Sequence, residues 1–98
     1  MIPIVTPQEL AAELQTENAP KLLDVRESNE LAVAKIDGVV HIPLGQLPVR
    51  FGELDPEADW VVICQVGVRS GHATQFLLGL GFKRVRNLAT GMNGWARL

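Results

Sequence analysis

The chain has 98 residues, 47% of them hydrophobic, and a formal net charge of -2. A chain of this length suits a single domain, assigned here to residues 1–98, that can bury about 60–65% of its unfolded surface. The charge argues against a nucleic-acid-binding domain. No apolar stretch approaches the roughly 18 residues that span a membrane, and from the first ten residues we expect no signal peptide. We therefore expect neither nucleic acid nor membrane as a partner, and a cytoplasmic location.

The chain contains one cysteine, Cys64, and two histidines, His41 and His72. A single thiol excludes an intramolecular disulfide, and the histidines do not have the spacing of zinc ligands. This use of cysteine fits a reducing compartment. We expect neither a metal nor an organic cofactor.

The chain opens with the pattern of a short strand followed by a helix. Ile2–Val5 is the strand candidate. In the segment TPQELAAEL, Thr6 can cap the helix, Pro7 takes the first helical position and Glu9 completes a capping box. The sequence therefore predicts a helix that begins directly after Thr6.

Strand and helix patterns then alternate toward the middle of the chain. Lys21–Val25 predicts a buried strand, and residues 27–34 predict a short helix with Ser28 as its cap. Gly38–Pro43 predicts another short strand, which the proline ends. Residues 44–54 have a helical pattern.

The second half of the chain repeats this alternation. Trp60–Cys64 is a continuous apolar run, typical of a strand that is buried on both faces. Residues 70–81 predict a helix that Gly81 closes as a left-handed cap. Residues 84–88 predict the last strand and residues 92–98 a final helical turn.

Alternating strands and helices with short connections predict an α/β fold. Its sheet is expected to be mostly parallel, with helices on both faces. Ligands of such sheets bind at the carboxyl ends of the strands. Cys64 lies at one such end, and Asp24 and Arg26 lie at another.

The loop after Cys64, with the sequence CQVGVRSG, has features that favour a thiolate. A thiol reacts through its ionised form, which the first amides and the dipole of a helix stabilise. Gly67 allows a tight turn that points successive N–H groups inward, and Arg69 adds a permanent cation. The alternative is an inert core cysteine, but such a residue needs no anion-binding loop.

Four segments in order resemble one known family. They are LLDVRESNEL, IDGVVHIPLGQL, VVICQVGVRS and LLGLGFKRVRNLATGMNGW. Together they are similar to the single-domain rhodanese-like sulfurtransferases, from about Val5 to Trp95. The resemblance implies a rhodanese-like α/β fold with a central five-stranded, mostly parallel sheet and helices on both faces.

The resemblance also implies a reaction. Cys64 would accept a sulfane sulfur from a small donor such as thiosulfate or a persulfide, and would pass it from a persulfide to cyanide, a thiol or a protein acceptor. Double displacement of this kind predicts ping-pong kinetics. The expected substrate-binding groups are the main-chain N–H groups of Gln65, Val66, Gly67, Val68 and Arg69. Supporting roles are assigned to Asp24, Arg26 and Ser70, with Asp24 interpreted as a structural brace and His72 as a bystander.

Two departures from known patterns bear on the substrate. Four residues separate Cys64 from Arg69, one fewer than in phosphatases and arsenate reductases, and the shorter loop favours sulfur transfer over phosphate hydrolysis. Gln65 stands where the family often carries a cation, which argues against efficient use of dianionic thiosulfate. Two alternatives stay open: a non-catalytic rhodanese-like module that binds or regulates a partner, and a phosphatase or arsenate reductase.

Overall fold

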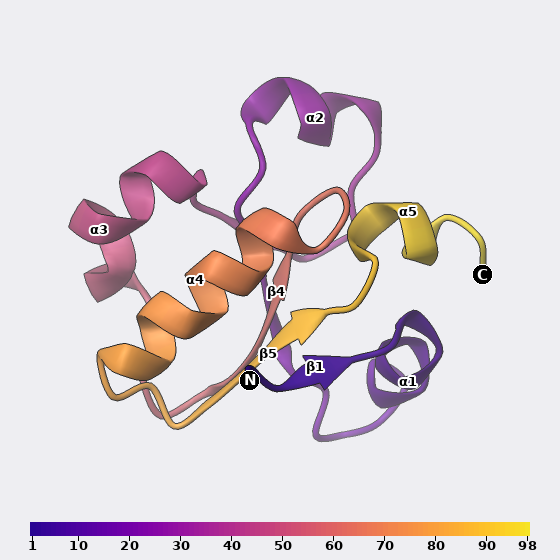
Figure 1. The fold of residues 1–98 in the computed structure, drawn as a ribbon. Coiled ribbons are helices and arrows are strands. Elements are labelled where there is room, and N and C mark those ends of the chain that lie inside the picture. Colours follow the sequence, from indigo (N-terminus) through magenta and orange to yellow (C-terminus); the bar gives the residue numbers. More distant parts are fainter.

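Five parallel strands form one sheet in the spatial order β1-β5-β4-β2-β3, as a computed structural model that describes residues 1–98 shows (Figure 1). The strands are β1 (Ile4–Val5), β2 (Lys21–Asp24), β3 (Val40–His41), β4 (Asp59–Ile63) and β5 (Arg84–Leu88). Every pairing is parallel, so the predicted α/β fold with a five-stranded sheet is confirmed.

The helices cover both faces of the sheet. They are α1 (Pro7–Glu13), α2 (Ser28–Val33), α3 (Leu47–Arg50), α4 (Val68–Gly79) and α5 (Gly91–Trp95), with 3-10 turns η1 (Leu44–Gln46) and η2 (Phe51–Glu53) on either side of α3. In Figure 1, α3 and α4 lie on one side of the sheet, and α1 and α5 lie on the other. None of these helices has the length and hydrophobicity needed to cross a bilayer.

The pleat of β4 divides the core between these two sides. Trp60, Val62 and Cys64 belong to the cluster of buried side chains that includes residues of α3 and α4. Val61 and Ile63 belong to the cluster that includes residues of α1 and α5. Because successive side chains point to opposite faces of a strand, the thiol side chain lies on the α4 side.

The strand register places two predicted site segments side by side. Asp24, the last residue of β2, pairs with Ile63, the last residue of β4. The N–H group of Val25 then donates to the carbonyl oxygen of Ile63 over 3.0 Å. The end of β2 therefore lies next to Cys64 at the carboxyl edge of the sheet.

Two helix boundaries follow the sequence prediction closely. The capping box of α1 is present, since Thr6 N–H donates to a Glu9 carboxylate oxygen over 2.9 Å and Thr6 Oγ1 accepts from Glu9 N–H over 3.1 Å. Gly81, with φ of +94°, stands just beyond α4 and lets the chain turn back. There the N–H group of Phe82 donates to the carbonyl of Leu77 over 3.1 Å.

The predicted cap of the second helix was wrong. Ser28 is the first residue of α2, and the capping position belongs to Glu27. The N–H group of Glu27 donates to a carboxylate oxygen of Glu30 over 3.0 Å, so Glu30 provides the side-chain acceptor at this end of the helix. The strand predicted over residues 38–43 is also shorter, because Gly38 has a φ of +85° and the regular pairing is confined to β3.

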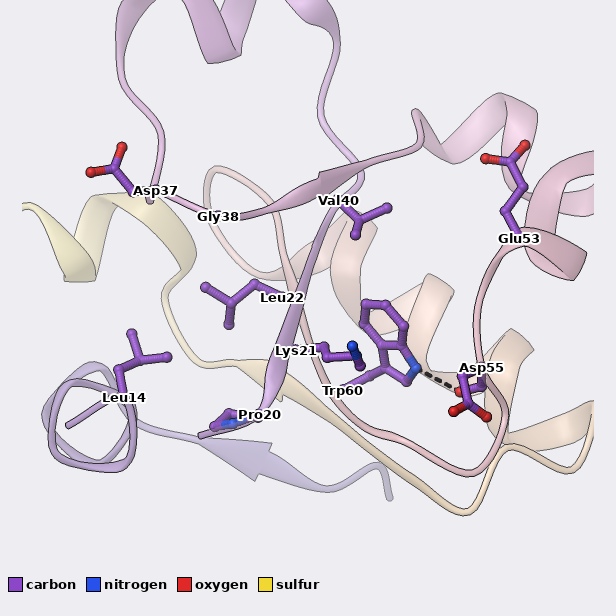
Figure 2. A pocket seen from close by; sticks show the side chains of 10 residues that line it. All are labelled: Leu14, Pro20, Lys21, Leu22, Asp37, Gly38, Val40, Glu53, Asp55 and Trp60. Atoms are coloured by element: carbon purple, nitrogen blue, oxygen red, sulfur yellow. Dashed lines mark hydrogen bonds between the residues drawn. The ribbon is translucent and has the colours of Figure 1, made fainter. Parts of the chain in front are cut away.

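A cavity of about 450 Å³ lies at the amino ends of β2 and β4, away from Cys64 (Figure 2). Trp60 forms part of its wall and is only 3% exposed, as expected of a core anchor. The indole N–H of Trp60 donates to the carbonyl oxygen of Asp55 over 2.9 Å, which is drawn as a dashed line in Figure 2. The single thiol of the chain, Cys64, lies at the opposite end of the sheet.

Leu77 should be a major contributor to the packing of α4. It has no exposed surface, so Leu77→Ala is expected to lower the free energy of unfolding by about 2–5 kcal/mol. Leu80→Ala is the matched control, because Leu80 is 46% exposed at the end of the same helix, and it should cost about 1 kcal/mol or less. Urea denaturation followed by circular dichroism measures both values. Equal losses would contradict the assignment of Leu77 to the core.

Candidate active site

The candidate site is the loop that joins β4 to α4. Cys64 follows the last residue of β4 directly, and α4 begins at Val68. Between them, Gly67 is the N-cap of α4 with a φ of +100°, a conformation that side-chain-bearing residues rarely adopt. The predicted glycine turn therefore brings the sulfur to the amino end of the helix.

The sulfur of Cys64 has polar contacts with this loop and with the first turn of α4. The N–H group of Gly67 donates to Sγ over 3.0 Å, and the hydroxyl oxygen of Ser70 lies 3.1 Å from Sγ. Cys64 has no exposed surface, and this burial by itself raises the pKa of the thiol. The Ser70 hydroxyl and the N–H groups of Ser70, Gly67 and Val66 outweigh the effect of burial, so the pKa of Cys64 lies below its ordinary value.

The carbonyl groups of Cys64 and Gln65 point toward α5. The carbonyl oxygen of Cys64 accepts from the N–H of Met92 over 2.9 Å, and that of Gln65 accepts from the N–H of Asn93 over 3.0 Å. A Cβ atom at Gly91 would collide with the Cys64 carbonyl oxygen and with the Gln65 backbone. The absence of a side chain at residue 91 therefore lets α5 hold the loop carbonyls while the loop N–H groups face the sulfur.

Asp24 and Arg26 form a buried ion pair at the end of β2. They are 0% and 1% exposed, and Arg26 Nη2 lies 2.9 Å from Asp24 Oδ2. The main-chain N–H of Arg26 also donates to Asp24 Oδ1 over 3.0 Å. Arg26 further donates to the carbonyl oxygen of Ala34 over 2.8 Å, beyond α2. Asp24 thus binds both the main chain and the side chain of Arg26, and its interpretation as a brace stays a prediction.

The side chain of Gln65 is held away from the sulfur. Its amide oxygen accepts from Arg26 Nη1 over 3.1 Å, and its Nε2 donates to Asn93 Oδ1 over 2.7 Å. Gln65 thereby links the buried arginine to α5. It lines a cavity of about 400 Å³ beside the loop, together with Met92 and Asn93.

The other predicted binding residues differ in what they contact. The N–H groups of Gln65, Val68 and Arg69 make no hydrogen bond to Sγ, in contrast to that of Gly67. The side chains of Val66 and Val68 are 55% and 61% exposed. Within the loop, the N–H groups of Gly67 and Val66 therefore act on the sulfur, and the side chains of Val66 and Val68 face solvent.

Arg69 is paired with an acidic residue that the sequence analysis did not single out. Its two terminal nitrogens lie 2.7 Å from the two carboxylate oxygens of Glu30 on α2. The hydrogen bonds from Arg69 are the main reason why the pKa of Glu30 falls to about 2. The cation expected to serve the thiolate is thus largely neutralised by Glu30.

Comparison with known proteins agrees with this geometry. The family model of the rhodanese-like domain matches residues 6–98. The chain belongs to this family. The resemblance noted from four sequence segments is therefore confirmed.

Relatives of this rhodanese-like chain include proteins named for sulfur transfer. A sulfurtransferase of Allochromatium vinosum is 31% identical over 97 residues, which cover 99% of this chain and 91% of the relative. The putative sulfurtransferase YtwF of Bacillus subtilis is 36% identical, with coverage of 88% and 82%. The putative sulfur carrier protein YrkF of Bacillus subtilis is 37% identical, and the chain spans about half of its length, 51%.

Solved structures of rhodanese-like proteins have the same fold. A rhodanese-related protein from Thermoplasma volcanium superposes with a TM-score of 0.90 at 28% identity, covering 97% of this chain and 91% of that protein. The human single-domain sulfurtransferase TSTD1 gives a TM-score of 0.84 at 30% identity, with coverage of 99% and 97%.

The ion pair of Glu30 with Arg69 should make stability depend on acid pH. Because the folded pKa of Glu30 is about 2 against an ordinary 4.5, its contribution is complete above about pH 4.5 and disappears as the pH falls through 2. The two side chains are 26% and 36% exposed, so we expect only about 0.5–1 kcal/mol. Glu30→Gln should lose this amount at neutral pH and approach wild-type stability near the folded pKa, as measured by urea denaturation across pH.

Glu17→Gln provides the control for charge removal. Glu17 is exposed and lies outside the ion pairs of this structure, so its substitution should leave stability unchanged across the same range. A Glu30→Gln deficit that did not shrink on acidification would contradict the assigned interaction.

Proposed function

We propose that this rhodanese-like chain is a sulfurtransferase that carries the transferred sulfur as a persulfide on Cys64. The observation that supports this most is the enclosure of Sγ by N–H and hydroxyl groups at the amino end of α4. Such groups favour a thiolate, the form of cysteine that attacks a sulfur–sulfur bond. The naming of relatives as sulfurtransferases supports the same reaction class.

In the first half-reaction, the Cys64 thiolate attacks the outer sulfur of the donor. A new sulfur–sulfur bond forms at Sγ as the donor's own sulfur–sulfur bond breaks, and the electron pair of that bond leaves on the donor remainder. The leaving group is sulfite from thiosulfate, or a thiolate from a persulfide. Loop N–H groups such as that of Gly67 are suited to stabilise the resulting persulfide anion.

In the second half-reaction, a nucleophilic acceptor attacks the outer sulfur of the persulfide. That sulfur leaves with the acceptor, and the Cys64 thiolate is released, so the cycle has no net change of oxidation state. Thiols, cyanide and protein thiols all have the required nucleophilic atom. Because Cys64 has no exposed surface, each half-reaction requires local opening of the loop around it.

The charges around the loop favour a donor with little negative charge. Glu30 occupies both terminal nitrogens of Arg69, and Gln65 supplies no cation. A thiosulfate dianion approaching the loop therefore meets an ion pair of Arg69 and Glu30 that has no net positive charge to attract it. We therefore assign a singly charged persulfide, small or protein-bound, as a better donor than thiosulfate.

The persulfide intermediate is directly measurable. Incubation with a persulfide donor, followed by removal of the donor, should add about 32 Da, one sulfur atom, to the intact chain. Cyanide should remove the added mass and yield thiocyanate. Cys64→Ser is the control and should neither gain the mass nor turn over. An unmodified wild-type chain, or a variant that keeps full activity, would contradict the proposal.

Donor preference should respond to the charge of Glu30. Glu30→Gln releases Arg69 and removes a carboxylate, so kcat/KM for thiosulfate should rise by about three- to tenfold, and that for an alkyl persulfide should change less. Glu53→Gln is the matched control, because it breaks a surface pair with Arg50 away from the loop. Steady-state thiocyanate formation measures both donors. An equal change for the two donors would argue against selection by charge.

The complete burial of Cys64 favours one alternative, a non-catalytic rhodanese-like binding module. An inert thiol would react with iodoacetamide far more slowly in the folded chain than in the urea-unfolded chain, even at alkaline pH. A sulfurtransferase instead requires a folded-state reaction whose pH midpoint lies below that of an ordinary cysteine.

A further inference from the structure

Asn87 is a buried polar residue that the proposed mechanism does not use. It lies on β5 between the half-buried Arg86 and the buried Leu88, and is itself only 7% exposed. Its side-chain amide spans the space between two parts of the active-site loop. The amide nitrogen donates to the carbonyl oxygen of Gly67 over 2.9 Å, and the amide oxygen accepts from the Ser70 hydroxyl over 2.5 Å.

The orientation of this amide follows from the chemistry of its partners. The Gly67 carbonyl can only accept a hydrogen bond, so the atom of Asn87 that faces it must be Nδ2. The other atom, Oδ1, can only accept, so the Ser70 hydroxyl that faces it must donate. The loop carbonyl of Gly67 therefore determines where the hydroxyl hydrogen of Ser70 points.

Ser70 has a single hydroxyl hydrogen and two neighbours that can accept it. One is Asn87 Oδ1, and the other is the sulfur of Cys64 at 3.1 Å. While Cys64 is a neutral thiol, its S–H group can donate to the Ser70 oxygen, and the Ser70 hydrogen can donate to Asn87 Oδ1. Each of these polar groups then has a partner. Once the thiol ionises, Sγ becomes an acceptor only, and it attracts the same hydrogen that Asn87 holds.

We propose that Asn87 is a positioning residue that competes with the Cys64 sulfur for the Ser70 hydrogen, holding it while the thiol is neutral and yielding it when the sulfur carries charge. The inference rests on the proposed function only in taking Cys64 as the reacting thiol. Asn87 thereby keeps the Ser70 hydrogen away from Sγ while Cys64 is a neutral thiol. Once Cys64 has ionised, the Ser70 hydroxyl can donate to Sγ instead.

The other polar groups near the sulfur are already paired, exposed or fixed in direction, so the Ser70 hydroxyl is the group that can change its hydrogen-bond acceptor. Arg69 is held by Glu30, and Arg26 is held by Asp24. The side chain of His72 on α4 is exposed. The N–H group of Gly67 also binds Sγ, but the backbone fixes its direction. The Ser70 hydroxyl is the donor at the sulfur that can rotate.

The test is the pH midpoint of Cys64 alkylation by iodoacetamide in three variants. Ser70→Ala removes the donor and should raise the midpoint, so that alkylation at neutral pH slows by about tenfold. Asn87→Leu removes the competing acceptor and should lower the midpoint. The double variant should match Ser70→Ala, because Asn87 acts through the hydroxyl that this variant lacks.

These signs separate the proposal from a merely structural role. If Asn87 only supported the loop, Asn87→Leu would misalign the loop N–H groups and raise the midpoint, as Ser70→Ala does. A raised or unchanged midpoint in Asn87→Leu would overturn the proposal. So would a double variant whose midpoint differs from that of Ser70→Ala.

A measurement on the unaltered side chain covers the case in which Asn87→Leu does not fold. The NMR signals of the Asn87 side-chain amide should titrate in the wild-type chain with the midpoint of Cys64, because the Ser70 hydrogen leaves Oδ1 at that point. The change should shrink severalfold in Ser70→Ala. The proposal would be overturned if the Asn87 amide signals did not shift across the Cys64 titration in the wild-type chain. It would also be overturned if they shifted equally in Ser70→Ala.

Neither experiment measures sulfur transfer. A chain that alkylates with the expected signs but forms no persulfide would refute the proposed function and leave the role of Asn87 intact. A chain that forms the persulfide but shows the wrong signs would do the reverse.

Discussion

The site depends on the directions in which the peptide N–H and carbonyl groups between β4 and α4 point. The N–H group of Gly67 faces the sulfur of Cys64, while the carbonyls of Cys64 and Gln65 face the first N–H groups of α5. A buried thiolate is costly unless donors surround it, and a peptide carbonyl turned inward would repel it. The positive φ of Gly67 lets its N–H group face the sulfur. The close approach of α5 at Gly91 lets the carbonyls of Cys64 and Gln65 find donors away from the sulfur.

Buried polar contacts at the end of β2 support this arrangement. The ion pair of Asp24 with Arg26 is completed by donors and acceptors from β2, the end of α2 and the side chain of Gln65. A buried pair of this kind is weak evidence for added stability, because desolvation offsets much of the attraction. Its value here lies in geometry, since it fixes the distance between β2 and the loop after β4. The sulfur is thus surrounded by groups whose own positions are determined.

Local patterns predicted the frame of the site and not its long-range partners. An apolar run before Cys64 and a glycine at residue 67 are sufficient to indicate a strand, a turn and a helix, and the structure has all three. Glu30 lies 39 positions from Arg69, so no local pattern joins them. Gly91 resembles an ordinary turn glycine, and only the packing of α5 shows its purpose. Asn87 gave no such signal, because β5 already contains Arg84 and Arg86, and the contacts that explain its burial come from the distant residues Gly67 and Ser70.

The dependence of Cys64 on α5 has a consequence for how the chain matures. A ribosome makes the chain from its amino end, so Cys64 is synthesised before Met92 and Asn93, whose N–H groups hold the adjacent carbonyls. During that interval the nascent chain has its thiol but not all of the contacts that position the loop around it. The arrangement of peptide groups around Cys64 is therefore completed only when α5 has been made, and the growing polypeptide carries an ordinary cysteine until then.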